Sequence, residues 1–131
     1  MKETYDGSKK LNLFLLSGFY VFAGVNHFIN PQFYYDLIPD YLPFHELINV
    51  VSGLAEIILG IGVIFQKTRK WSSYLLVTML ISFIPAHIYF IQIGSCVEGG
   101  MCVSEWIGWA RLLIIHPLLI WWALSVTSTD K

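Results

Sequence analysis

LINVVSGLAEIILGIGVIFQ, from Leu47 to Gln66, is the stretch of sequence that decides the fold. It is apolar almost throughout and carries one carboxylate, Glu56, near its middle. A helix of this length rises about 30 Å, the thickness of the hydrocarbon core of a bilayer. A charged side chain at that depth costs roughly 2.5 kcal/mol or more, so it is kept where another group compensates it. The stretch therefore predicts a membrane-spanning helix whose carboxylate has a partner.

The composition of the whole chain also favours a membrane protein. Of the 131 residues, 56% are hydrophobic and 13% are charged, against about 25% charged residues in an average soluble domain. We therefore expect a single membrane domain over residues 1–131. The sequence contains no glycine-rich phosphate loop and no basic patch interleaved with aromatic residues. Nucleic acid is accordingly not an expected partner.

Three further apolar runs predict an all-α integral membrane protein, a bundle of four transmembrane helices. The spans are expected at residues 11–28, 47–66, 71–94 and 106–126. Pro85 should kink the third span, because proline lacks the amide hydrogen that a helix needs. Between the first two spans, residues 29–46 are rich in proline and tyrosine. This segment cannot cross the membrane as one helix, and we expect it to lie on the external face.

The positions of lysine and arginine predict the orientation of the bundle. Seven of the eight basic residues lie in the N-terminal leader, in the turn Lys67–Lys70 or in the C-terminal tail, and Arg111 lies inside a span. The positive-inside rule places these three segments in the cytoplasm. Both termini are then cytoplasmic, and the expected location is the cytoplasmic (inner) membrane, crossed several times.

Polar side chains from all four spans are predicted at similar depths in the outer half of the bilayer, from a rise of about 1.5 Å per residue. The candidate ligand-binding residues are Asn26, His27, Ser52, Glu56, His87 and Arg111. His116 is left out, because on an α-helix it should point about 140° away from Arg111.

Two interpretations of these residues are open. In the first, Glu56 and Arg111 form a buried ion pair that fixes the helix register, and backbone carbonyls satisfy the histidines. In the second, the groups line a pocket that opens outward and binds a polar head group such as a quinone carbonyl, with histidine exchanging protons. No metal site is predicted, because the histidines lie on separate helices without a diagnostic spacing.

The two cysteines, Cys96 and Cys102, fall in the loop before the fourth span, on the predicted external side. In an oxidising compartment they are expected to form a disulfide that staples this loop. The alternative is redox exchange with a bound quinone. Against it, the pair is not C-x-x-C, and Glu98 and Glu105 would raise a thiol pKa rather than lower it.

Several motifs, taken in order, resemble the DoxX-like family of small four-span membrane proteins over residues 11–124. They are Gly24-x-x-His27-Phe28, Pro31-x-x-Tyr34, Ile38-Pro39, Leu42-Pro43, Ser52-Gly53-x-x-Glu56, Lys67–Lys70, Pro85-Ala86, Trp109-x-Arg111-Leu112 and Trp122-Ala123. The resemblance implies a four-helix bundle in the cytoplasmic membrane with a link to quinones. Two departures place histidine near the pocket, His87 where relatives often have asparagine and His116 where many have glutamine.

Two functions are carried forward. The first is a redox-associated membrane subunit that binds a quinone, with Glu56 and Arg111 positioning the head group and His27 or His87 exchanging the proton. The alternative is a non-catalytic assembly or chaperone factor for a larger membrane complex. The expected partners are the lipid bilayer and either membrane oxidoreductase subunits or further copies of the chain. The sequence identifies no catalytic residue and no substrate.

Overall fold

A computed structural model describes residues 2–127, and this part of the chain is helical, with no strand. Met1 and residues 128–131 lie outside the described residues, and with them Lys131, which the orientation prediction counts. Within the described residues, four helical stretches are long and apolar enough to cross a membrane: Gly7–Ile29, His45–Gly62, Gln66–Gln92 and Glu105–Ser125. The prediction of a four-helix multi-pass membrane protein is confirmed at this level.

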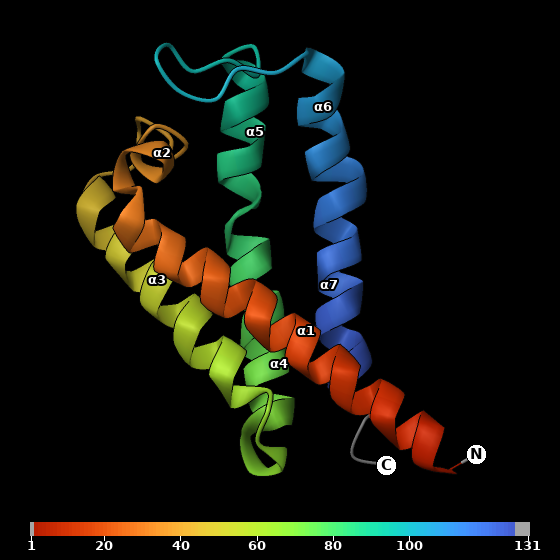
Figure 1. The fold of residues 1–131 in the computed structure, drawn as a ribbon. Coiled ribbons are helices and arrows are strands. Elements are labelled where there is room, and N and C mark those ends of the chain that lie inside the picture. The colour runs from red at the N-terminus through yellow and green to blue at the C-terminus, as the bar shows by residue number, and fades with distance from the viewer. Residues whose placement is uncertain (1, 128–131) are drawn as a thin grey trace.

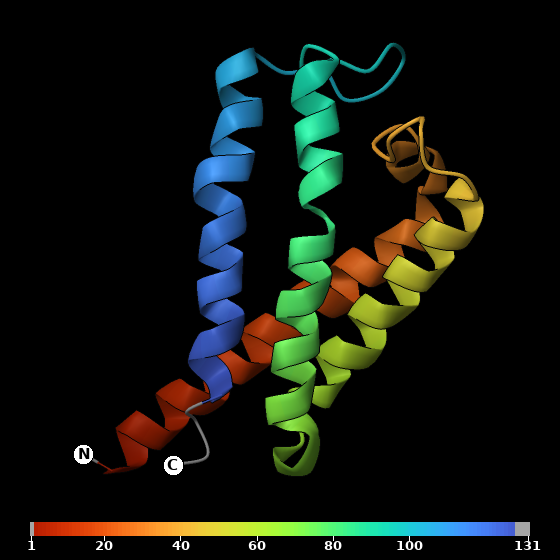
Figure 2. The same cartoon turned by 180° about the vertical axis from the view of Figure 1, so that it is seen from behind.

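The helices form two groups that run between the same two ends of the molecule. The first group is α1 (Lys2–Ile29) packed along α3 (His45–Gly62). The second combines α4 (Gln66–Ser82) and α5 (Ile84–Gln92) with α6 (Glu105–Ala110), η1 (Arg111–Ile115) and α7 (His116–Ser125). Figure 1 and Figure 2 show α1 and α3 slanting across the second group.

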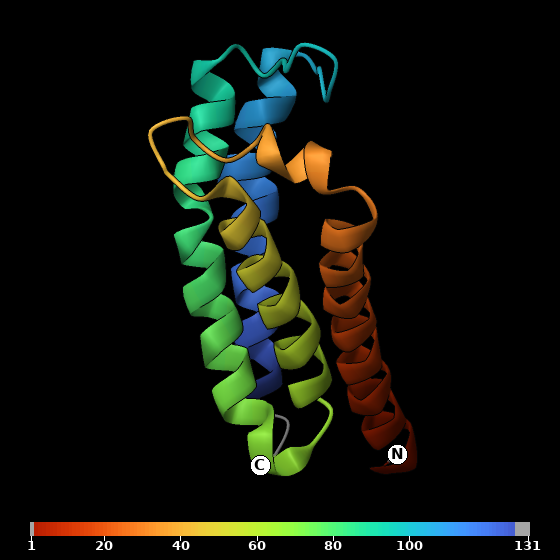
Figure 3. The same ribbon diagram turned by 90° about the vertical axis from the view of Figure 1, so that its left-hand side faces the viewer.

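The two ends of the bundle differ in what they carry. Both chain ends and the turn between α3 and α4 lie at one end, while α2 (Pro31–Tyr35) and the loop before α6 lie at the other (Figure 3). The buried core lies toward the end with the termini, where Leu16, Val63, Leu76 and Val126 are fully buried. The apolar side chains therefore fill one half of the bundle, and the polar residues predicted as a site lie in the other.

Helix boundaries differ from the predicted ones at the N-terminus and at the basic turn. The leader is not a separate segment, because α1 is helical from Lys2. The second span ends at Gly62, where Thr68 Oγ1 donates a hydrogen bond of 2.6 Å to the Gly62 carbonyl. The buried Arg69 guanidinium donates to the carbonyls of Val63 and Ile64, both at 2.9 Å. The basic residues thus belong to the start of α4, and Arg69 and Thr68 cap the end of α3.

Proline interrupts both helices of the second group. The expected break in the third span is confirmed, since α4 ends at Ser82 and α5 begins at Ile84, one residue before Pro85. In the fourth span, residues Arg111–Ile115 form a π-helical turn immediately before Pro117. Nothing in the periodicity of the sequence predicts this turn. A π turn holds one more residue than an α turn and changes which side chains share a face.

Glycines let α1 and α3 approach closely. A Cβ atom added to Gly24 would lie 2.6 Å from the Gly53 carbonyl oxygen, and one added to Gly53 would lie 2.8 Å from His27 Cβ. A Cβ atom added to Gly60 would likewise lie 3.1 Å from Tyr20 Cβ. Small residues at a helix crossing permit this backbone contact inside a membrane. The contact brings the last turns of α1 against the middle of α3.

The segment between α1 and α3 does not form a membrane-length helix. It consists of α2, which has five residues, followed by turns that bury Ile38 and Pro39. The Pro39 carbonyl lies 3.2 Å from His45 Nε2, at the start of α3. We call residues 31–44 the cap segment, because they cover the end of the bundle away from the termini (Figure 3).

The replacement Gly53→Ala should lower the free energy of unfolding by about 1–3 kcal/mol, because the added methyl group meets the backbone of α1. Unfolding by denaturing detergent in mixed micelles measures this change. Gly18→Ala is the matched control on the same helix pair, since nothing lies within 4 Å of its added Cβ. It should leave stability unchanged or raise it by up to about 1 kcal/mol, because alanine favours a helix over glycine, and equal losses for both variants would contradict the close helix contact.

Candidate functional site

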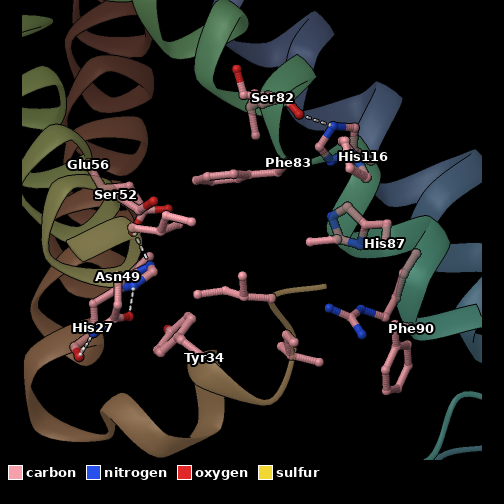
Figure 4. A pocket seen from close by; sticks show the side chains of 18 of the residues that line it. His27, Tyr34, Asn49, Ser52, Glu56, Ser82, Phe83, His87, Phe90 and His116 are labelled. Atoms are coloured by element: carbon pink, nitrogen blue, oxygen red, sulfur yellow. Dashed lines mark hydrogen bonds and ion pairs between the residues drawn. The ribbon is translucent and has the colours of Figure 1, made fainter. Parts of the chain in front are cut away.

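A cavity of about 300 Å³ lies between the two helix groups, in the half of the bundle beneath the cap segment. Its lining comes from α1, the cap segment, α3, α4, α5, η1 and α7. Most of this lining is apolar or aromatic, including Phe19, Leu37, Leu80, Phe83 and Leu119. Figure 4 shows that the labelled polar residues stand in two groups facing each other across the cavity. The cavity is therefore mostly apolar, with polar side chains on two opposite walls.

The first polar wall is built by α1 and α3. His27 Nε2 lies 3.3 Å from Glu56 Oε2, and both side chains are about nine-tenths buried or more. Asn49 accepts a 2.6 Å hydrogen bond from His27 Nδ1 through Oδ1, and its Nδ2 donates to the His27 backbone carbonyl at 3.0 Å. The close contact of the glycines places α1 and α3 within reach of these interactions.

Asn49 fixes the tautomer of His27. The His27 carbonyl can only accept, so the Asn49 amide must present its NH₂ there and its oxygen to Nδ1. Nδ1 therefore carries a hydrogen, and a neutral His27 would present a bare Nε2 to the Glu56 carboxyl group. Two lone pairs cannot face each other at 3.3 Å without repulsion. A hydrogen on either His27 Nε2 or the Glu56 carboxyl group would remove this repulsion.

Tyr34 of the cap segment covers this pair. Its ring stacks on the His27 imidazole, with centroids 3.6 Å apart and planes 17° from parallel. Asn26 Nδ2 donates to the Tyr34 hydroxyl at 2.8 Å. Burial raises the pKa of the Tyr34 phenol, the Asn26 hydrogen bond opposes this shift and the charge of Glu56 adds to it. Tyr34 therefore stays a neutral phenol over the physiological range of pH.

The second polar wall is built by α5, η1 and α7. The Arg111 guanidinium lies over the Phe90 ring, with Cζ 4.9 Å from the centroid, and its Nη1 lies 3.9 Å from Met101 Sδ. Among the described residues, no ion pair joins Arg111 to Glu56, whose partner is His27. The predicted Glu56–Arg111 ion pair is thus wrong. Both residues line the same cavity, but from different helix groups.

His116 lines the cavity together with His87, contrary to the prediction that it points away. The two rings meet edge to face, with centroids 4.8 Å apart. His116 Nε2 donates to the Leu80 carbonyl at 2.6 Å, one turn before the break at Pro85. The π-helical turn explains the difference, because residues five apart lie much nearer one face in a π turn than in an α-helix.

Two buried oxygen atoms at the cavity have no hydrogen-bond partner. They are the hydroxyl of Tyr20, which is 1% exposed, and Oε2 of Glu56, whose contact with His27 is an ion pair without hydrogen-bond alignment. Buried polar atoms are normally satisfied. Unpaired polar atoms in the wall of a cavity are suited to receive polar groups of a ligand.

The structure brings most of the predicted site residues together. His27, Ser52, Glu56, His87 and Arg111 line the cavity, whereas Asn26 lies behind Tyr34 and does not. Sequence reasoning missed the cavity residues Tyr20, Tyr34, Asn49 and His116. The spacing of Asn49, three residues before Ser52 and seven before Glu56, could have identified it, because those positions share a helix face.

The disulfide joins Cys96 to Cys102, as expected, and closes the loop between α5 and α6. Met101, which contacts Arg111, directly precedes Cys102 in this loop. No group of three or more histidine, cysteine, aspartate or glutamate side chains that could hold a metal ion occurs among the described residues.

Comparison with protein families gives one match. The model of a family described as Domain of unknown function (DUF8561) matches residues 16–127. The chain belongs to the DUF8561 family. The matched range contains every cavity residue, so the site lies within the family domain. No curated protein and no solved structure matches the chain. No DoxX-like family model matches, and the resemblance to that family remains a resemblance of motifs.

Replacing Asn49 by alanine should lower the free energy of unfolding by about 1–3 kcal/mol, because it leaves the buried Nδ1–H and carbonyl of His27 without partners. NMR of protein labelled with ¹⁵N-histidine should also show the His27 proton distributed over both ring nitrogens instead of held on Nδ1.

Ser52→Ala is the matched control for Asn49→Ala, since Ser52 lines the same cavity from the same helix without a hydrogen bond. Its stability should stay within about 0.5 kcal/mol of the wild type. An unchanged His27 tautomer in the Asn49 variant would contradict the positioning role.

Proposed function

We propose that this DUF8561 protein binds a quinone-type head group inside the membrane, as a redox-associated subunit. The observation that carries the proposal is the pair of polar walls facing each other across an apolar cavity. A quinone is a flat apolar ring with an oxygen at each of two opposite ends. Ligand sites of this kind are mostly apolar with a few placed polar groups.

Each wall offers a group that can donate to an oxygen of the ring. On the first, the Tyr20 hydroxyl has no hydrogen-bond partner, and Glu56 and His27 lie in contact beside it in the lining. On the second, Arg111 offers a planar array of N–H donors, and His87 lies next to it in the lining. Phe83 provides an aromatic face between the walls, and Phe90 lies under Arg111 in the second wall. This arrangement supports binding of the ring by both ends, with proton exchange at the Glu56–His27 end.

The finer assignments belong to the same proposal. The motif resemblance to the DoxX-like family supports the redox role. In that role the protein would associate with an oxidoreductase subunit or with a second copy of the chain. The gathering of Lys9, Lys10, Lys67 and Lys70 at the end with the termini supports a cytoplasmic location of that end. The cap segment and the disulfide loop then face outward from the cytoplasmic membrane.

Thermal-shift and difference-spectrum titrations of the purified protein with decyl-ubiquinone and a menaquinone analogue test the proposed function. We expect saturable binding, weakened about ten- to a hundredfold by Glu56→Gln, because a charge-assisted hydrogen bond is worth about 1.5–3 kcal/mol.

The matched control for this titration is Glu105→Gln, which removes an exposed carboxylate outside the cavity and should bind as the wild type does. Absence of saturable binding, or equal binding by the two variants, would rule out the proposed site. A stable complex with a membrane partner in the absence of quinone binding would instead favour an assembly factor.

Cysteine labelling in intact cells tests the orientation. A membrane-impermeant maleimide should label Cys96 and Cys102 only after reduction, because the disulfide faces outward. In a Cys96→Ser/Cys102→Ser background, Lys67→Cys should stay unlabelled until the membrane is permeabilised. Labelling of the Lys67→Cys variant in intact cells would reverse the proposed orientation.

A further inference from the structure

Arg111 has no acceptor of full negative charge among the described residues. Its contacts are a thioether sulfur, Met101 Sδ, and the face of the Phe90 ring. Neither replaces a carboxylate, which accepts two parallel hydrogen bonds from the guanidinium fork. The guanidinium is therefore held in place on one side by weak partners and borders the cavity on the other.

The acidic residues near this end of the cavity do not neutralise Arg111. Glu56 is engaged with His27 on the opposite wall. In the segments that cover this end, Asp36 accepts a hydrogen bond from Gln32, and Asp40, Glu98 and Glu105 form no ion pair with Arg111. The titratable neighbours from the packed helices are His87 and His116, which bring no negative charge.

An uncompensated guanidinium within a membrane-spanning helix is costly and is usually met by an opposite charge. Arg111 lies six residues into the fourth span, which corresponds to about 9 Å of helix rise. Since the described protein supplies no counter-charge there, a ligand in the cavity is placed to do so. The neutral carbonyl of an oxidised quinone would satisfy one donor but leave the charge unbalanced.

We propose that Arg111 is an oxyanion-binding site and that the cavity selects ligands whose head group presents an ionised oxygen there, as the phenolate of a hydroquinone does. The proposal rests on the proposed function and deepens it, because it assigns the preferred form of the ligand. The rest of the head group would lie against Phe83, toward the Tyr20 hydroxyl, which has no hydrogen-bond partner, and toward Glu56.

The cavity argues for an oxyanion attached to an apolar body. A small inorganic anion would occupy a minor part of about 300 Å³ and leave the apolar lining uncovered. A phenolate on a ring and a carboxylate on an alkyl chain share the required chemistry. The aromatic lining and the polar groups on the far wall favour a phenolate on a ring. A competition experiment between a hydroquinone and an alkyl carboxylate distinguishes the two ligands.

The experiment uses full-length protein in phosphatidylcholine nanodiscs and the probe 4-hexyl-2-nitrophenol, whose phenolate has its own absorbance band. Binding to the wild type should lower the apparent pKa of the probe by one unit or more relative to empty nanodiscs, because phenolate binds at least tenfold more tightly than phenol. The methyl ether of the probe, which cannot ionise, should bind at least tenfold more weakly than the phenol.

Variants then assign the shift to the guanidinium. Arg111→Gln should abolish the shift, and Arg111→Lys should keep part of it, because it keeps the charge without the fork. Lys70→Gln is the matched control, since it removes an exposed positive charge at the other end of the bundle and should leave the shift unchanged. The comparison of phenol with methyl ether needs no variant, so it holds even if an Arg111 variant fails to fold.

The outcomes separate the two proposals. Displacement of the probe by decyl-hydroquinone supports both, whereas displacement by dodecanoate alone keeps the oxyanion site and contradicts the quinone-type ligand. Saturable binding of decyl-ubiquinone with no lowering of the probe pKa overturns the oxyanion site and leaves the proposed function standing. An equal shift in wild type and Arg111→Gln also overturns the oxyanion site, and absence of all binding overturns both.

Discussion

The contact between α1 and α3 is the constraint on which the rest of the structure depends. A carboxylate inside a membrane-spanning helix requires compensation, and Glu56 receives it from His27 on the neighbouring helix. That is geometrically feasible because Gly24 and Gly53 bring the two backbones together without intervening side chains. Asn49 then holds the imidazole by both its ring nitrogen and its backbone carbonyl. The helix packing and the polar wall of the cavity are therefore one arrangement.

The bundle divides its length between a packed apolar core and a cavity. Toward the termini, large apolar side chains fill the space between the helices, and Trp122 Nε1 ties α7 to Asn12 of α1 by a 2.7 Å hydrogen bond. Beneath the cap segment the same helices diverge around a cavity. The breaks near Pro85 and before Pro117 lie between these regions, and His116 links them through the Leu80 carbonyl. The hydrogen bond of His116 thus ties the last turn of α4 to the start of α7.

The sequence predicted the spans and the depth of the polar residues, because both follow from helix rise and apolar length. It did not predict the direction of side chains around each helix. Depth alone suggested that Glu56 would pair with Arg111, the complementary charge, but the two belong to different helix groups and Glu56 pairs with His27. The π-helical turn, which no periodicity rule signals, brought His116 to the cavity. Depth alone does not single out Asn49 either, although its spacing of seven residues from Glu56 places both on one face of the helix.

Arg69 illustrates how one residue can answer two separate demands. As a cation at the end with the termini it adds to the charge bias on which the proposed orientation in the membrane rests. Its guanidinium also closes the hairpin between α3 and α4 by donating to two carbonyls that the ended helix leaves open. Other basic side chains in the same turn can supply the orientation, but only a forked donor at this position reaches both carbonyls. The geometry of the hairpin, rather than the sign of the charge, is therefore what calls for arginine at this position.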